Sequence, residues 1–213
     1  MYQKKILYPA FLAAGLLLAA AASRPLADPV VFQVPPSFPA PQYDFSRNPL
    51  TRQGIELGRR LFYDPVLSRD STVSCASCHL SFTAFTHVDH ALSHGIGDRT
   101  GRRNAPALIN LAWSRAFMWD GAIHHLDFQA LAPISDSTEM GETLDNVVRK
   151  LNKRADFRAL FAAAFDNSTA TGEKVLKALA QFELTLVSAN SKYDRVRAGL
   201  DSFSVQEQNG YAL

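Results

Sequence analysis

Cys75, Cys78 and His79 carry the clearest chemical signature in the chain, as the string Cys-Ala-Ser-Cys-His. The two thiols are spaced to add across the two vinyl groups of a haem, and the adjacent imidazole can then bind the iron. A redox Cys-x-x-Cys pair, half of a zinc site and a plain disulfide are the alternatives. A thioredoxin-like pair needs a βαβ setting and a zinc ribbon needs a second cysteine pair, and the sequence has neither. The string therefore predicts one covalently attached haem c, with His79 as a ligand of its iron.

Helices are expected to position this string. Asn48 followed by Pro49 predicts one helix start, and Thr143 predicts another, each before apolar residues at helical spacing. Residues 174–189 show a further helical pattern. No alternating apolar run is long enough to predict a sheet, whereas residues 75–119 contain several glycines and predict a functional loop region. The expected fold class is all-α.

The first 47 residues precede the expected domain. Lys4 and Lys5, followed by a charge-free apolar stretch, predict a secretory signal peptide over residues 1–22 and export to a bacterial periplasm. An uncleaved membrane anchor is the alternative. Residues 23–47 contain six of the eleven prolines and predict an extended, semi-rigid leader that takes no part in the core. The haem domain is expected to span residues 48–205.

The composition excludes several classes of protein. The chain has 22 Lys and Arg against 20 Asp and Glu, and without Lys4 and Lys5 the two totals are equal. A neutral body lacks the electrostatic footprint of a nucleic-acid-binding protein. A hydrophobic content of 47% argues against intrinsic disorder, and two cysteines cannot hold together a disulfide-rich miniprotein. One core-forming domain is the class that fits.

Several sequence blocks surround the Cys-Ala-Ser-Cys-His string in a defined order. They are Leu57-Gly-Arg-Arg-Leu-Phe-Tyr-Asp-Pro-Val-Leu-Ser68, Gly101-Arg-Arg-Asn-Ala-Pro106, Met118-Trp-Asp-Gly121, Gln129-Ala130, Pro133-Ile134 and Glu139-Met140. In order and spacing the blocks resemble the N-terminal half of bacterial dihaem cytochrome c peroxidases and the related MauG-type enzymes, over about Pro49 to Leu213. The resemblance implies a cytochrome c-like haem domain that reduces hydrogen peroxide to water. It also implies an electron donor, which would be a c-type cytochrome, a cupredoxin or a second haem domain.

The resemblance further implies roles for single residues. Glu139 matches the distal carboxylate that acts as acid and base, and Gln129 matches the amide beside it. Trp119 matches the tryptophan that lies between the two haems of the full-length enzymes. Asn104 matches a side-chain ligand of a calcium ion, so calcium is implied as a second cofactor. Without the resemblance, these four residues would be interpreted as a solvated carboxylate, a surface amide, a core aromatic and a turn residue.

Two departures from the family pattern bear on the iron. Ile96 stands where the family members with a blocked resting state have a distal histidine, so we expect a five-coordinate iron that is open to peroxide. His94 could substitute if its loop shifts, and His87 and His90 are further candidates, although each also fits an exposed loop histidine. Ala122 replaces the arginine that commonly follows Trp-Asp-Gly, and this removes one side of whatever salt bridge that arginine makes.

A third departure concerns the second haem. Residues 206–213 resemble the start of the helix that leads into a second Cys-x-x-Cys-His string, which this sequence does not contain. The expectation is a first haem domain without its electron-entry domain, monomeric or homodimeric, with weak or absent turnover by itself. Two rival functions stay open. A monohaem electron carrier would use Met118, Met140 or His94 as a strong sixth ligand, and a MauG-type oxidase would act on a protein side chain.

Overall fold

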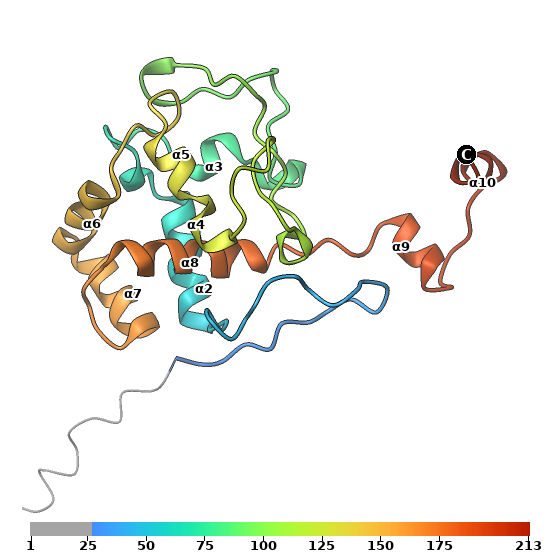
Figure 1. Ribbon diagram of the computed structural model, residues 1–213, viewed down its shortest axis with the longest axis horizontal. Coiled ribbons are helices and arrows are strands. Elements are labelled where there is room, and N and C mark those ends of the chain that lie inside the picture. Colours follow the sequence, from blue (N-terminus) through green and yellow to red (C-terminus); the bar gives the residue numbers. More distant parts are fainter. Residues whose placement is uncertain (1–26) are drawn as a thin grey trace, which may run out of the picture.

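The computed structural model describes residues 27–213 (Figure 1). Within this range no segment forms a named strand, and β pairing is confined to isolated bridges. The predicted all-α class is therefore confirmed. The α-helices are α2 (Arg52–Tyr63), α3 (Cys75–Cys78), α4 (Leu126–Gln129), α5 (Leu131–Ser135), α6 (Leu144–Lys153), α7 (Ala155–Phe165), α8 (Gly172–Leu184), α9 (Lys192–Arg197) and α10 (Val205–Tyr211), with short 3₁₀ turns at Pro65–Leu67, Ser81–Thr83, Ile96–Asp98 and Leu111–Trp113.

Helices α2 and α8 cross at the centre of the fold (Figure 1). Gly58 allows the close approach, because a Cβ atom at this position would lie 1.9 Å from the carbonyl oxygen of Ala178. Helices α6 and α7 pack against the same pair, and together the four helices enclose the main apolar core. Their fully buried side chains include Leu57, Leu61, Phe62, Val147, Leu151, Phe157, Phe161, Val175 and Leu179.

Threonine side chains begin three of these four helices. The hydroxyls of Thr51, Thr143 and Thr171 each accept a hydrogen bond from the backbone N–H three residues later. The predicted start at Thr143 is therefore confirmed. The predicted start at Asn48 is wrong, because this side chain is buried before the N-cap and its amide donates to the carbonyl oxygen of Lys177 at 3.1 Å. The side chain of Asn48 thus bonds to Lys177, a residue distant in the sequence, instead of capping the helix that follows it.

The described part of the proline-rich segment forms no helix or named strand, makes turns at residues 36–37 and 45–47, and is not separate from the core. Val30, Phe32, Tyr43 and Phe45 are partly buried against a second, smaller apolar cluster. The indole N–H of Trp113 also donates to the carbonyl oxygen of Pro39 at 2.7 Å. The expectation of a leader that takes no part in the core is thus wrong for residues 30–45. The smaller cluster consists of Leu50, Ala112, Phe117, Leu126, Ala180 and Leu184.

The C-terminal helices α9 and α10 lie away from the body of the fold (Figure 1). They contact each other through the rings of Tyr193, Phe203 and Tyr211, whose centroids lie 5.4 to 6.4 Å apart. Between residues 27 and 213, no helix has the length and apolar character needed to cross a bilayer. The predicted signal peptide at residues 1–22 lies outside the described residues.

Candidate haem and peroxide site

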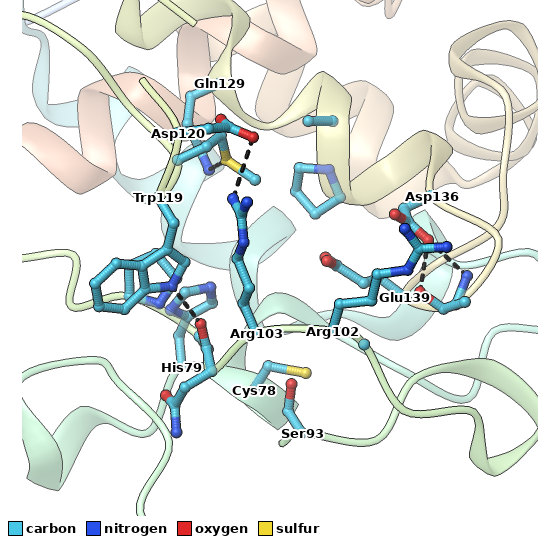
Figure 2. A pocket seen from close by; sticks show the side chains of 18 of the residues that line it. Cys78, His79, Ser93, Arg102, Arg103, Trp119, Asp120, Gln129, Asp136 and Glu139 are labelled. Carbon is cyan, nitrogen blue, oxygen red and sulfur yellow. Dashed lines mark hydrogen bonds and ion pairs between the residues drawn. The ribbon is translucent and has the colours of Figure 1, made fainter. Parts of the chain in front are cut away.

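A cavity of about 750 Å³ opens beside α3 (Figure 2). Figure 2 shows Trp119 and Gln129 on one side of it and Glu139 on the other, with the side chain of Arg103 between them and that of Arg102 reaching toward Asp136. Four segments that are distant in the sequence thus converge on one space. The lining residues include Cys78, His79, Ser93, Arg102, Arg103, Asn104, Met118, Trp119, Asp120, Gln129, Asp136 and Glu139.

The Cys-Ala-Ser-Cys-His string forms the single helical turn α3 and the residue after it. Residues three apart on a helix lie on the same side, so the turn presents Cys75 and Cys78 together. Both thiols are free, which the disulfide interpretation does not fit. The turn starts with a hydrogen bond from the N–H of Ser74 to the hydroxyl of Ser77 at 3.1 Å. It ends with the N–H of His79 donating to the carbonyl oxygen of Cys75 at 2.9 Å.

His79 is oriented by a backbone carbonyl. Its Nδ1 lies 2.7 Å from the carbonyl oxygen of Phe85, so Nδ1 carries the proton and donates it. Ala84 and Phe85 both adopt a left-handed backbone conformation, with φ of 57° and 58°, and this turn directs the carbonyl toward the ring. Burial lowers the pKa of His79. The ring is therefore neutral and leaves Nε2 as the nitrogen that can bind a metal.

Gln129 and Glu139 reach the cavity from opposite ends of a short helical stretch. Gln129 is the last residue of α4, and its amide donates to the sulfur of Met118 at 3.6 Å. Glu139 follows α5 and is half-buried. Burial raises the pKa of Glu139, and the nearby charge of Asp136 raises it further. The loop that carries Glu139 packs tightly against Gly95, where a Cβ atom would lie 2.1 Å from the carbonyl oxygen of Thr138.

Trp119 and Asn104 lie together at the mouth of the cavity. Trp119 is 63% exposed, so it is not the core aromatic that its residue type alone would indicate. Its indole N–H donates to the carbonyl oxygen of Asn104 at 2.7 Å. The side-chain amide of Asn104 donates to the carbonyl oxygens of His87 and Ala91, both at 3.1 Å. Among the described residues, no group of three or more His, Cys, Asp or Glu side chains could hold a metal ion, and calcium at Asn104 stays a prediction.

Ile96 and the three loop histidines considered for the sixth position of the iron, His87, His90 and His94, do not line the cavity. Ile96 is 1% exposed and packs against Gly141. His94 is bonded to Asp98, with 2.6 Å between Nδ1 and Oδ1. The ring of His90 lies between those of His94 and His87, with centroids 4.7 and 4.6 Å away. Of the predicted alternatives, Met118 lines the large cavity and Met140 a smaller one beneath it.

Three charged residues at this site were not singled out from the sequence. Arg103 pairs with Asp120 at 3.1 Å, and the N–H of Ala122 donates to the same carboxylate, which lowers the pKa of Asp120. This arginine therefore gives Asp120 a partner although position 122 holds alanine. Arg102 and Glu183 were also missed. The two consecutive arginines in the sequence were a usable signal for Arg102 and Arg103. A glutamate among the inward-facing residues of α8 was a signal for Glu183.

Known proteins are similar to this chain over most of its length. A family described as "Di-haem cytochrome c peroxidase" matches residues 52–202. Methylamine utilization protein MauG of Methylorubrum extorquens is 37% identical over 185 residues, which is 85% of this chain and 51% of that protein. Cytochrome c peroxidase Ccp of Escherichia coli is 33% identical over 180 residues, which is 84% of this chain and 37% of that protein.

A solved structure gives the same result for the fold. The crystal structure of a MauG-like protein associated with microbial copper homeostasis matches with a TM-score of 0.78 at 32% identity, over 85% of this chain and 54% of that chain. The chain thus spans about half the length of this protein and of the MauG relative. These similarities confirm the resemblance seen in the sequence blocks and the expected cytochrome c-like fold. The chain belongs to the di-haem cytochrome c peroxidase family.

Proposed function

We propose that this chain is the haem-binding, peroxide-reducing part of a periplasmic peroxidase. The observation that carries the proposal is the convergence of His79, Gln129 and Glu139 on one cavity. Membership of the di-haem peroxidase family supports the same activity. The periplasm fits covalent haem attachment and the signal peptide expected at residues 1–22.

The residues around the cavity fit one covalently attached haem c. Cys75 and Cys78 lie on one turn as free thiols, and a neutral His79 follows them directly. Arg102 and Arg103 line the same cavity and provide positive charge suited to the two carboxylates of a haem. When bound, the haem supplies the redox-active iron at which the O–O bond of hydrogen peroxide is reduced.

The protein residues move a proton across the peroxide. Glu139 takes the proton from the oxygen nearer the iron and delivers it to the farther oxygen, which leaves as water when the O–O bond breaks. Its pKa, raised by burial and by Asp136, makes the carboxylate a stronger base for this exchange. Gln129 is buried on the opposite side of the same cavity and orients the peroxide through its amide. The complete reduction takes up two electrons and two further protons and gives two molecules of water.

Electrons must come from outside this domain. Trp119 is exposed at the mouth of the cavity and is the group best placed to face a donor, which would be a c-type cytochrome, a cupredoxin or a second haem domain. The same exposure favours a second candidate, the MauG-type oxidation of a protein side chain that contacts Trp119. The alternative function as a monohaem electron carrier has less support. The sulfur of Met118 already accepts a hydrogen bond from Gln129, and His94 does not line the cavity.

The absorption spectrum of the haem-loaded ferric protein, before and after one equivalent of peroxide, tests the proposal. We expect a high-spin spectrum that changes within one turnover. Replacing the acid–base group by Glu139→Gln should slow this change by about 10²-fold to 10⁴-fold. Glu173→Gln is the control, because Glu173 pairs with Lys177 outside the haem cavity. A low-spin spectrum that peroxide leaves unchanged would instead support the electron carrier.

A further inference from the structure

A second hollow, which we call the side groove, lies where α4, α5 and α6 meet α8. Its volume of about 480 Å³ falls within the range of about 300 to 1,000 Å³ that is typical of small-molecule sites. None of its lining residues belongs to either cavity beside the Cys-Ala-Ser-Cys-His string, so a ligand here would not compete with the haem for space. The lining residues are Arg47, His125, Asp127, Phe128, Leu131, Leu144, Glu173, Leu176 and Lys177.

Four apolar side chains contribute to the side groove. Leu176 is buried, and Leu144 is half-buried and packs against the main core. Phe128 and Leu131 are 59% and 38% exposed, although both are large apolar residues. Helix α4 separates the groove from the large cavity, because Phe128 lines the groove and the next residue, Gln129, lines the cavity. The hydrocarbon part of a ligand would bury this apolar surface favourably.

Asp127 places a carboxylate in the same groove, and its side chain is only 9% exposed. The Oδ1 atom accepts two hydrogen bonds, from the hydroxyl of Tyr43 at 2.6 Å and from the amide of Asn48 at 3.2 Å. Burial and the bond to Asp127 raise the pKa of Tyr43, so the phenol keeps its proton and acts as the donor. Both donors therefore hold the carboxylate by one oxygen.

The second oxygen of Asp127, Oδ2, has no hydrogen-bond donor among the described residues. The Nδ1 atom of His125 lies 3.8 Å from it. This nitrogen accepts the backbone N–H of Asp127 at 3.2 Å, so it carries no proton that it could donate. A buried carboxylate oxygen without a donor is costly. Oδ2 is therefore a position at which a ligand that donates a hydrogen bond would be stabilised.

The charges around the side groove leave Asp127 as the buried group without a cation. Lys177 and Glu173 pair with each other at 2.7 Å. Arg47 is exposed, and its backbone N–H bonds to the carbonyl oxygen of Asp44 at 3.4 Å, which places a second exposed carboxylate in the same turn. The carboxylates of Asp127, Glu173 and Asp44 thus outnumber the two cations. A positively charged ligand fits this balance better than an anion.

We propose that the side groove binds a small organic amine in its ammonium form. The ammonium donates a hydrogen bond to Oδ2 of Asp127, and the hydrocarbon part lies against Phe128, Leu131, Leu144 and Leu176. An ammonium suits this site better than a planar guanidinium, which pairs with both oxygens of a carboxylate, because only Oδ2 is free. The proposal does not depend on the peroxidase function, since the groove shares no residue with the haem cavity.

Calorimetric titration of the haem-loaded full chain with 2-phenylethylamine at pH 6.5 tests the proposal. The controls are 2-phenylethanol and 3-phenylpropanoate, which carry a neutral and an anionic head on a similar aromatic body. We expect saturable binding of the amine with a Kd of about 1 mM or lower, and binding about 10-fold weaker or more for both controls. If the anion binds as tightly as the amine, or if the amine shows no saturable binding up to about 10 mM, the proposal is wrong.

Two variants place the binding in the side groove. Asp127→Asn keeps the shape of the side chain and should weaken amine binding by about 10-fold or more, because the charge-assisted bond is lost. Phe128→Ala changes an exposed side chain and should weaken it by about 3-fold or more, because apolar contact is lost. Phe82→Ala is the control, since Phe82 is exposed outside the groove. Parent-like affinity in Phe128→Ala, or in an Asp127→Asn chain with a parent-like circular dichroism spectrum, would refute the proposal.

The absorption spectrum of the haem distinguishes the side groove from the iron as the place of binding. An amine in the groove should leave this spectrum unchanged, because the groove is separate from the haem cavity. An amine nitrogen that bound the iron would change it. A spectral change that saturates together with the calorimetric signal and persists in Asp127→Asn would assign the amine to the iron and overturn the proposal.

Discussion

The helical base of the molecule and the loop wall of its cavity are built by different physical means. The helical base, formed by α2, α6, α7 and α8, is held by apolar side chains that are fully buried. The loop wall, residues 80–125, contributes few side chains to the apolar clusters, such as Leu108 and Phe117, and it is rich in single hydrogen bonds and unusual backbone conformations. Of the seven non-glycine residues with positive φ in the described part of the chain, five lie in it: Ala84, Phe85, Asp98, Asn110 and Met118.

The difference assigns stability and chemistry to different parts of the chain. Each left-handed residue costs roughly 1 kcal/mol or more, and it persists only where the surroundings determine it. In the loop wall these residues direct the carbonyl that binds His79 and the turn that presents Met118 and Trp119. The helical base, with its fully buried apolar side chains, provides the fixed support. Changes in the base should therefore affect unfolding, and changes in the wall should affect the cavity.

The largest expected effect is the loss of a core ring from the helical base. Phe161 of α7 is fully buried, and Phe161→Ala should lower the free energy of unfolding by about 3 to 5 kcal/mol, because it removes apolar contacts and leaves a cavity. Phe82 of the loop wall is 77% exposed, and Phe82→Ala should change the free energy of unfolding by less than about 0.5 kcal/mol. Urea unfolding measures both. Equal effects would contradict the division between base and wall.

A smaller effect, with opposite signs at two buried glutamates, should appear in the pH dependence of unfolding. The pKa of Glu183 is raised from 4.5 to about 8, so the folded chain keeps a proton that the unfolded chain loses, and stability falls as pH rises between these values. As the pH rises from 5 to 7, the free energy of unfolding of Glu183→Gln should increase by about 2 to 3 kcal/mol relative to that of the parent.

Glu142 should show the reverse. Its lowered pKa stabilises the folded chain above pH 4.5, and that contribution is lost as pH falls into the acid range. The difference between Glu142→Gln and the parent should therefore stay constant from pH 5 to pH 7 and shrink below pH 4.5. Unfolding curves at four pH values measure both differences. If the free energies of unfolding of the two variants, relative to the parent, changed with pH in the same way, the different surroundings of Glu183 and Glu142 would not determine the charges of these side chains.

The helical base could be predicted from the sequence because its signals are local. Thr143 with the apolar spacing after it fixed one helix start, and the pattern at residues 174–189 found α8, although the helix begins at Gly172 and ends at Leu184. The start at Asn48 was predicted wrongly because its partner, Lys177, is 129 positions away. Periodicity cannot reveal such a partner.

For the cavity, the sequence predicted several of the lining residues but not the contacts that they make. The Cys-Ala-Ser-Cys-His string by itself predicted the turn that we propose binds haem, and the resemblance directed attention to Gln129 and Glu139, which do reach one cavity. Nothing local indicated that Arg103 would pair with Asp120 or that Ile96 would pack on Gly141. Glu183 was missed because a glutamate in an amphipathic helix is normally solvated, although its position four residues after Leu179 placed it on the inward face of the helix.

The smallest expected effect sharpens the comparison most, because it uses the same side chain in both regions. Asn104 in the loop wall and Asn152 in the helical base each donate to two carbonyl oxygens and accept one hydrogen bond. Replacing either by alanine should lower the free energy of unfolding by about 1 to 2 kcal/mol, since the net value of each bond is modest. Only Asn104→Ala should alter the cavity, because the indole of Trp119 is bonded to the backbone of that residue.

Iodide quenching of tryptophan fluorescence distinguishes the two variants. The chain has two tryptophans, and Trp113 donates to Pro39 away from the cavity lining. Asn104→Ala removes the hydrogen bonds to His87 and Ala91 that hold residue 104, whose backbone carbonyl accepts from the indole of Trp119. The variant should therefore increase the quenching of Trp119. Asn152→Ala should leave quenching unchanged at the same loss of stability. If both variants changed quenching alike, the wall would be coupled to the base through the whole fold, and its hydrogen bonds would not act locally.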